Sequence, residues 1–162
     1  MESNYKKFGV CFKKMIDKEI KIREFKLSDL SKIIKIEKES FKDPYSRIVF
    51  LMLHALFPKG FLVAQINGEI VGYCSFYVIR KKASLVSIAV SKKFRKRGIG
   101  KALMKEAIER IKGKAKEFEL QVRVSNEDAI RFYEGFGFEK VKIIKRYYLI
   151  DGEDALVMRL RL

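Results

Sequence analysis

The sequence is poor in the residues that form disulfides or bind metal ions, with two cysteines and one histidine in 162 residues. It also has only two prolines and no tryptophan. Cys11 and Cys74 lie far apart and outside any C-x-x-C spacing, so they predict neither a disulfide framework nor a zinc site. No window of about 18 residues is apolar and uncharged, and residues 1–14 lack the apolar centre of a signal peptide. These absences predict a soluble protein that stays in the cytoplasm.

Positive charge is abundant. Lys and Arg number 36 against 20 Asp and Glu, which gives a formal net charge of +16. Such a charge favours anionic partners, among them phosphates, nucleic acid, ribosomes and acidic peptides, without choosing among them. The hydrophobic content of 48% is sufficient for one core. We therefore expect one domain over residues 19–162, preceded by a basic extension over residues 1–18.

The hydrophobic pattern predicts an α/β domain in which a mixed sheet carries helices on its faces. Ser28 is the expected N-cap of a first helix, which ends before Asp43 and Pro44. Asn67-Gly68 is the residue pair that most readily forms a tight hairpin turn. The expected strands cover residues 19–25, 61–66, 69–79, 84–90, 118–124, 138–150 and 155–162, and the later helices cover 45–57, 98–112 and 125–136.

Residues 90–103 run from a strand through a cationic loop into the glycines that begin a helix. Gly98 and Gly100 have no Cβ, the first N–H groups of a helix lack intrahelical partners, and the helix dipole adds partial positive charge. A pyrophosphate can be held by such a backbone. The alternative is that the glycines only make a tight connection. The basic residues around them are Lys92, Lys93, Arg95, Lys96, Arg97 and Lys101.

Two common phosphate motifs do not fit this loop. A P-loop would need glycine and Ser or Thr at the positions of Arg95 and Ala102. The dinucleotide fingerprint would need its third glycine at the position of Leu103. The loop therefore predicts phosphate binding of another kind.

The segment Arg95-Lys-Arg-Gly98-Ile-Gly100 resembles the R/Q-x-x-G-x-G/A signature of the GNAT superfamily of N-acetyltransferases. Val122-Arg-Val-Ser-Asn126, Phe132-Tyr-Glu134 and Arg146-Tyr-Tyr148 follow at the spacing of protein N-terminal acetyltransferases. From about Ile20 onward the chain resembles the branch of ribosomal-protein alanine acetyltransferases and archaeal and eukaryotic N-terminal acetyltransferases. The resemblance implies the GNAT fold, a mostly antiparallel sheet of about seven strands with helices on both faces, and acetyl transfer from acetyl-CoA without a metal.

The same resemblance implies roles in holding the coenzyme. The backbone of Ile88, Ala89 and Val90 would pair with the pantetheine arm, and an N–H near Val90 would polarise the acetyl carbonyl. Asn126 would contact the pantetheine region, and Tyr133 would be the general acid toward the departing thiolate. Asn126 could instead only start a helix, and Tyr133 only fill the core. The pyrophosphate cradle would consist of Arg95, Lys96, Arg97, Gly98, Ile99, Gly100 and Lys101.

Aromatic residues are the implied substrate contacts. Tyr147 and Tyr148 correspond to the paired tyrosines that line the family's peptide cleft, although they could instead fill the two faces of a strand. We expect Phe41 and Tyr45, with Tyr148, to contact the first side chain of the substrate.

The general base is where the sequence departs from the family pattern. Related enzymes carry glutamate or histidine at the position of Gln121, and a glutamine can orient a water but cannot accept the proton as a base. Asp43 is the first candidate to replace it and Glu39 the second, although Asp43 could be only a turn residue before Pro44. An α-amine titrates at about pH 8 and a lysine at about pH 10.4, so a weak base suits N-termini better.

We therefore expect direct acetyl transfer, in a ternary complex, to the α-amine of a protein or peptide, with a ribosomal protein as one candidate and ribosome association as a further expectation. Two alternatives remain open: acetylation of a lysine side chain or polyamine, and a non-enzymatic RNA-binding or ribosome-binding module. The sequence contains no recognisable RNA-reading or DNA-reading motif, so no specific nucleic acid is expected as a partner, and no membrane.

Overall fold

The computed structural model describes residues 20–162, which form a seven-stranded open sheet in the order β1-β2-β3-β4-β5-β7-β6. Every neighbouring pair is antiparallel except β4 and β5. This confirms the expected mixed, mostly antiparallel sheet. The proposed extension over residues 1–18 lies outside the described residues. The strands are β1 (Lys21–Glu24), β2 (Phe61–Ile66), β3 (Glu69–Ile79), β4 (Lys82–Val90), β5 (Glu117–Arg123), β6 (Glu139–Ile144) and β7 (Ala155–Arg161).

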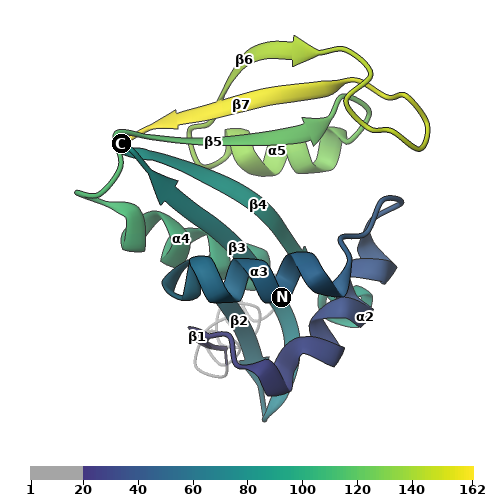
Figure 1. Ribbon diagram of the computed structural model, residues 1–162, viewed down its shortest axis with the longest axis vertical. Coiled ribbons are helices and arrows are strands. Elements are labelled where there is room, and N and C mark those ends of the chain that lie inside the picture. Colours follow the sequence, from purple (N-terminus) through teal and green to yellow (C-terminus); the bar gives the residue numbers. More distant parts are fainter. Residues whose placement is uncertain (1–19) are drawn as a thin grey trace, which may run out of the picture.

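Helices cover both faces of the sheet, as expected (Figure 1). On one face α2 (Leu30–Ser40) and α3 (Arg47–Leu56) share a core with β2 and β3 that buries Ile33, Phe50 and Tyr73 completely. On the other face α4 (Ile99–Ile111) and α5 (Glu127–Glu134) cover a second core. Three short 3-10 helices, η1 (Leu27–Asp29), η2 (Pro58–Gly60) and η3 (Lys92–Phe94), connect the elements. No helix within residues 20–162 is long and apolar enough to cross a membrane.

Local sequence explains two of these elements directly. In α4 the apolar residues recur every three or four positions, and that side of the helix is buried against the sheet at Ile99, Leu103 and Ile111. Between β2 and β3 the predicted tight turn is present, with φ of +47° at Asn67 and +83° at Gly68.

The parallel strands β4 and β5 separate along their length. Residues 82–84 pair with residues 117–119, and no further pairs follow. On its other edge β4 stays paired with β3 as far as Val90. Figure 1 shows β4 and β5 meeting near the C-terminus and then diverging. This split leaves a V-shaped opening between the two halves of the sheet, and the backbone of residues 85–90 faces it.

The strand predicted over residues 138–150 is too long. β6 ends at Ile144, so Tyr147 and Tyr148 lie in the loop before β7 and do not occupy two faces of a strand. The Oδ1 atom of Asp154 accepts a hydrogen bond from the N–H of Arg146 at 2.9 Å, and Arg146 has a φ of +51°. This left-handed residue ends the extended run and turns the chain into a loop.

The N-cap of the first helix is also one residue later than predicted. Ser28 lies within η1, and α2 begins after Asp29, whose carboxylate forms an ion pair with Arg23 at 2.7 Å. In α5 the N-cap is Asn126, one residue after the start of the predicted range 125–136: its Oδ1 accepts a hydrogen bond from the N–H of Ala129 at 3.1 Å.

Candidate active site

The predicted phosphate loop joins β4 to α4 at the open end of the V. Gly98 is the N-cap of α4 and has a φ of +83°, which glycine adopts without strain. The N–H groups in the first turn of the helix lack intrahelical partners. A Cβ at Gly98 would meet no heavy atom within 4 Å, and one at Gly100 would be 3.6 Å from the ring of Phe132. The helix start is therefore open to a ligand, and its charge and N–H groups fit a pyrophosphate.

Arg95 holds this loop in place. Its Nε donates a hydrogen bond to the carbonyl of Val90 at 3.0 Å, and its Nη2 donates to Oγ of Ser40 at 3.1 Å. The guanidinium thus ties the loop to the end of β4 and to the end of α2. Lys96 and Arg97 remain exposed beside the glycines.

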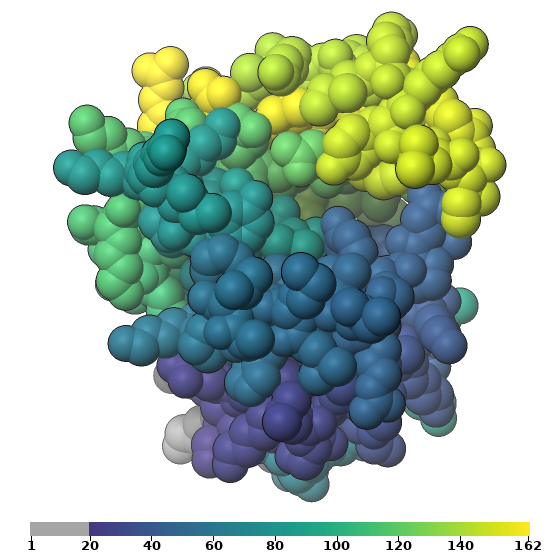
Figure 2. Space-filling view, viewed as in Figure 1, coloured from purple at the N-terminus to yellow at the C-terminus, as the bar shows by residue number. Residues whose placement is uncertain are grey.

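A pocket of about 420 Å³ occupies the V. Figure 2 shows it as a hollow between the blue surface of the α2–α3 region and the yellow-green surface around the β6–β7 loop. Ala89, another predicted site residue, does not line this pocket, and its side chain is buried in the core beneath α2. Val90 and residues 95–101 lie outside the pocket lining. The predicted site residues that the structure brings together here are Phe41, Asp43, Tyr45, Ile88, Gln121, Asn126, Tyr133, Tyr147 and Tyr148.

Tyr133 enters the pocket from α5. Only 8% of the residue is exposed, and its ring packs against Phe132 and Phe138. Burial raises the pKa of Tyr133 well above its ordinary value. The phenol therefore keeps its proton at neutral pH, as a general acid must before the transfer.

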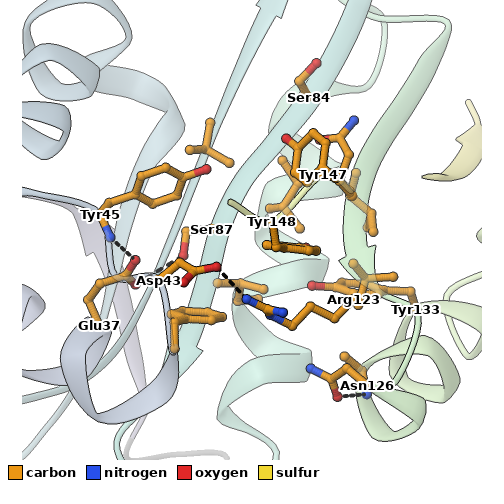
Figure 3. Close-up of a pocket in the computed structure, with 18 of the residues that line it drawn as sticks. Glu37, Asp43, Tyr45, Ser84, Ser87, Arg123, Asn126, Tyr133, Tyr147 and Tyr148 are labelled. Atoms are coloured by element: carbon orange, nitrogen blue, oxygen red, sulfur yellow. Dashed lines mark hydrogen bonds and ion pairs between the residues drawn. The ribbon is translucent and has the colours of Figure 1, made fainter. Parts of the chain in front are cut away.

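Arg123, which was not among the predicted site residues, connects the two walls of the pocket (Figure 3). It donates hydrogen bonds to Asp43 on the α2–α3 loop and to Asp151 and Glu153 on the β6–β7 loop, at 2.5, 2.9 and 2.6 Å. Its guanidinium carbon also lies 3.9 Å from the ring centre of Tyr148. Burial acts to lower the pKa of Arg123, but the hydrogen bonds to Asp151 and Glu153 outweigh it and raise the pKa.

Asp43, the first candidate for the base, is therefore already engaged. Its Oδ2 atom is held by Arg123, and its Oδ1 atom is buried with no hydrogen-bond partner in the described part of the chain. Gln121 lines the same pocket from β5. The contacts of Asp43 fit a residue that positions the loop better than one that accepts a proton.

The buried carboxylate of this pocket is Glu37, which the sequence did not single out. Glu39, the second candidate, lies about 200° further around α2 and lines a separate hollow with Lys35 and Lys92. Glu37 is 1% exposed, and its Oε1 accepts a hydrogen bond from the N–H of Tyr45 at 2.9 Å. Burial raises the pKa of Glu37, against the opposing effect of its hydrogen bonds.

Residues 30–138 match the model of the acetyltransferase (GNAT) family. The chain belongs to this family. It is 37% identical over 155 residues to the N-alpha-acetyltransferase of Sulfurisphaera tokodaii, covering 87% of this chain and 92% of the relative. It is 34% identical over 141 residues to a Bacillus subtilis protein named putative [ribosomal protein bS18]-alanine N-acetyltransferase, covering 85% and 92%. The crystal structure of Ard1 from Thermoplasma volcanium has a TM-score of 0.85 and 30% identity, covering 89% of this chain and 98% of that one.

Membership of the GNAT family confirms the predicted fold, enzyme class and cosubstrate. The protein is an acyl-CoA-dependent N-acetyltransferase that uses acetyl-CoA. This favours the enzymatic prediction over the non-enzymatic RNA-binding alternative.

Proposed function

We propose that this acetyltransferase modifies the N-terminal α-amine of proteins or peptides by direct attack in a ternary complex. One observation carries the proposal: residues predicted to contact the coenzyme share a single pocket with residues predicted to contact a peptide. Asn126 and Tyr133 belong to the first group, and Phe41, Tyr45 and Tyr148 to the second. The names of the Sulfurisphaera and Bacillus relatives support the same class of acceptor.

The proposed coenzyme site runs along β4 to the start of α4. Acetyl-CoA supplies the acetyl group as a thioester. The free edge of β4 at residues 88–90 would bind the pantetheine arm as an added strand, and the N–H groups of Ile99, Gly100 and Lys101 would bind the pyrophosphate. Backbone N–H groups near Val90 would stabilise negative charge on the acetyl oxygen.

Two residues from the wall of the pocket formed by β5 and α5 complete the proposed chemistry. Tyr133 would give its Oη proton to the departing sulfur, a role that its protonated, buried phenol supports. Gln121 would orient a water molecule beside the amine. Its side-chain amide can hydrogen-bond to a water but cannot accept a proton from it.

The proposed peptide cleft lies between the α2–α3 loop and the β6–β7 loop. Phe41, Tyr45 and Tyr147 are each about two-fifths exposed, so apolar ring surface is available to the first side chain of a substrate. The carboxylate of Glu37 on the same side favours a cationic amine, whereas the charge of Asp43 is compensated by Arg123. An α-amine with a pKa of about 8 needs less help in losing its proton than a lysine with a pKa of about 10.4.

The direct test compares one peptide with a free N-terminus and the same peptide with that terminus blocked, each carrying an internal lysine. With acetyl-CoA, we expect turnover of the free peptide and loss of nearly all turnover on blocking. Equal turnover of the two peptides would instead identify a lysine acetyltransferase.

We further propose a cytoplasmic enzyme that associates with ribosomes. The net charge of +16 and the ribosomal substrate named for the Bacillus relative support this proposal. Sedimentation with purified ribosomes should occur at low salt and decrease at high salt, because charge attraction is screened. No sedimentation at low salt would contradict it.

A further inference from the structure

Three polar side chains from three elements meet behind the β4 wall of the pocket: Glu37 of α2, Tyr73 of β3 and Ser87 of β4. Their exposed fractions are 1%, 0% and 6%. The hydroxyl of Tyr73 donates to Oε2 of Glu37 and lies 2.8 Å from Oγ of Ser87, which is 3.4 Å from the same carboxylate oxygen. Glu37 and Ser87 both line the pocket, and Figure 3 shows them on the wall opposite Tyr133.

Among the described residues, none supplies a compensating cation to Glu37. The polar groups that face it are the Tyr73 phenol, the Ser87 hydroxyl and the N–H of Tyr45, and no Lys or Arg within residues 20–162 forms an ion pair with it. Asp29, the buried N-cap residue of α2, is by contrast paired with Arg23. A carboxylate buried without a cation is unfavourable for folding, so a glutamine would serve a purely structural role better.

We propose that Glu37 is the terminal proton acceptor of the acetyl transfer and that Ser87 and Tyr73 relay the proton to it from the amine. The inference rests on the proposed function of this pocket. Glu37 would be the general base that the pocket otherwise lacks. Gln121 cannot accept a proton, and Asp43 is held by Arg123. The three side chains form a continuous hydrogen-bonded path from the pocket surface to the carboxylate.

The proton transfers balance. The arriving ammonium gives one proton to Oγ of Ser87, while the Ser87 proton moves to Oη of Tyr73 and the Tyr73 proton moves to Oε2 of Glu37. The neutral nitrogen then bonds to the acetyl carbon, the carbon–sulfur bond breaks, and the sulfur takes a proton from Tyr133. The remaining acidic N–H proton restores Tyr133. The products are an amide, a thiol and a protonated Glu37, which releases its proton to solvent.

This relay predicts a characteristic pH profile. With Glu37 ionised, the enzyme accepts the ammonium form of the substrate, so kcat/KM reaches a plateau once the pH exceeds the pKa of Glu37. Without Glu37 only the neutral amine reacts, and kcat/KM keeps rising until about pH 8, the pKa of an α-amine. A change that only damaged the structure would lower kcat/KM equally at every pH.

The experiment compares Glu37→Gln with Glu39→Gln, its matched control two residues along the same helix and outside the pocket. Both are assayed with a free-N-terminus peptide and acetyl-CoA from about pH 6 to about pH 9. We expect Glu37→Gln to lose about 100-fold in kcat/KM at about pH 7, with a deficit that shrinks toward about pH 9, and Glu39→Gln to match wild type. An unchanged rate, or a loss constant across pH, would overturn the proposal.

Ser87→Ala tests the relay separately, because it removes the hydroxyl at the pocket surface and leaves the carboxylate in place. We expect a smaller loss with the same dependence on pH, and a wild-type profile for Ser87→Ala would contradict the relay. If Glu37→Gln fails to fold, the pH profile of Ser87→Ala still tests the relay. Absence of wild-type turnover on the peptide would contradict the proposed function itself; with that turnover present, the variants test the relay alone.

Discussion

Asp43 and Arg123 form an ion pair across the cleft, with 2.5 Å between Oδ2 and Nη2. The two residues are 80 positions apart in sequence, and the pair joins the α2–α3 loop to β5. Because Arg123 also bonds to Asp151 and Glu153, one guanidinium sets the distance between both walls of the proposed peptide cleft. Its side chain is 15% exposed, so solvent screens these pairs less than it screens surface pairs.

Replacing Arg123 should therefore damage peptide binding more than coenzyme binding. Arg123→Leu leaves Asp43 and Glu153 without their cation and Asp151 with only the exposed Lys42, and we expect the loops to separate and the KM for peptide to rise about tenfold or more. The KM for acetyl-CoA should stay near the wild-type value. Arg131→Leu is the control, because Arg131 forms only exposed ion pairs on α5. Equal increases in both KM values would contradict a role confined to the peptide cleft.

Removing the phenol of Tyr133 should lower kcat. Tyr133→Phe keeps the ring packing, and we expect a loss of about 100-fold in kcat with an unchanged melting temperature. Because burial raises the pKa of Tyr133, loss of its proton should not reduce wild-type activity up to about pH 9. Steady-state kinetics over pH check both statements. A wild-type kcat in Tyr133→Phe would remove the acid assignment.

Gly98 should matter both for stability and for the coenzyme. Gly98→Ala forces a positive φ on a residue with a Cβ, at a cost of about 1 kcal/mol, and we expect the KM for acetyl-CoA to rise. Gly113, after α4, has a φ of +72° and equally open surroundings, so Gly113→Ala should lose similar stability without that change in KM. Matching KM effects in the two variants would argue against a phosphate site at Gly98.

The pKa of Glu37 also gives a prediction about folding. Burial raises that pKa in the folded state, so the contribution of Glu37 to stability is complete below its unfolded pKa of about 4.3 and is lost as the pH rises through the folded pKa. Glu37→Gln should therefore have a higher melting temperature than wild type at about pH 7, and the difference should disappear at about pH 4. Thermal unfolding at the two pH values measures this. A less stable Glu37→Gln at neutral pH would contradict it.

The features that could be predicted from the sequence depend on neighbouring residues. The Asn67-Gly68 turn and the glycine start of α4 need only local backbone conformations, so short motifs identify them. The strand predicted over residues 138–150 was too long because residues 145–150 have the composition of a strand. The hydrogen bond between Asp154 and Arg146 overrides that preference, and no propensity scale contains it.

The features that could not be predicted depend on distant pairs. Glu37 bonds to residues 36 and 50 positions away, and Arg123 to residues 28, 30 and 80 positions away. In a chain with 36 basic and 20 acidic residues, composition does not identify which charges meet. One signal was present: Glu37 shares the buried side of α2 with Ile33 and Ile36, and a charged residue in an apolar stripe is unusual.

The identity of the acetylated amine is the central claim. Its most direct test is mass-spectrometric mapping of a peptide that carries both a free α-amine and internal lysines, after reaction with the enzyme and acetyl-CoA at about pH 7. We predict one acetyl group on the α-amine and unmodified lysines, because the α-amine has the lower pKa and the cleft opens beside Phe41 and Tyr45. Acetyl groups on the lysines with a free α-amine would contradict the account.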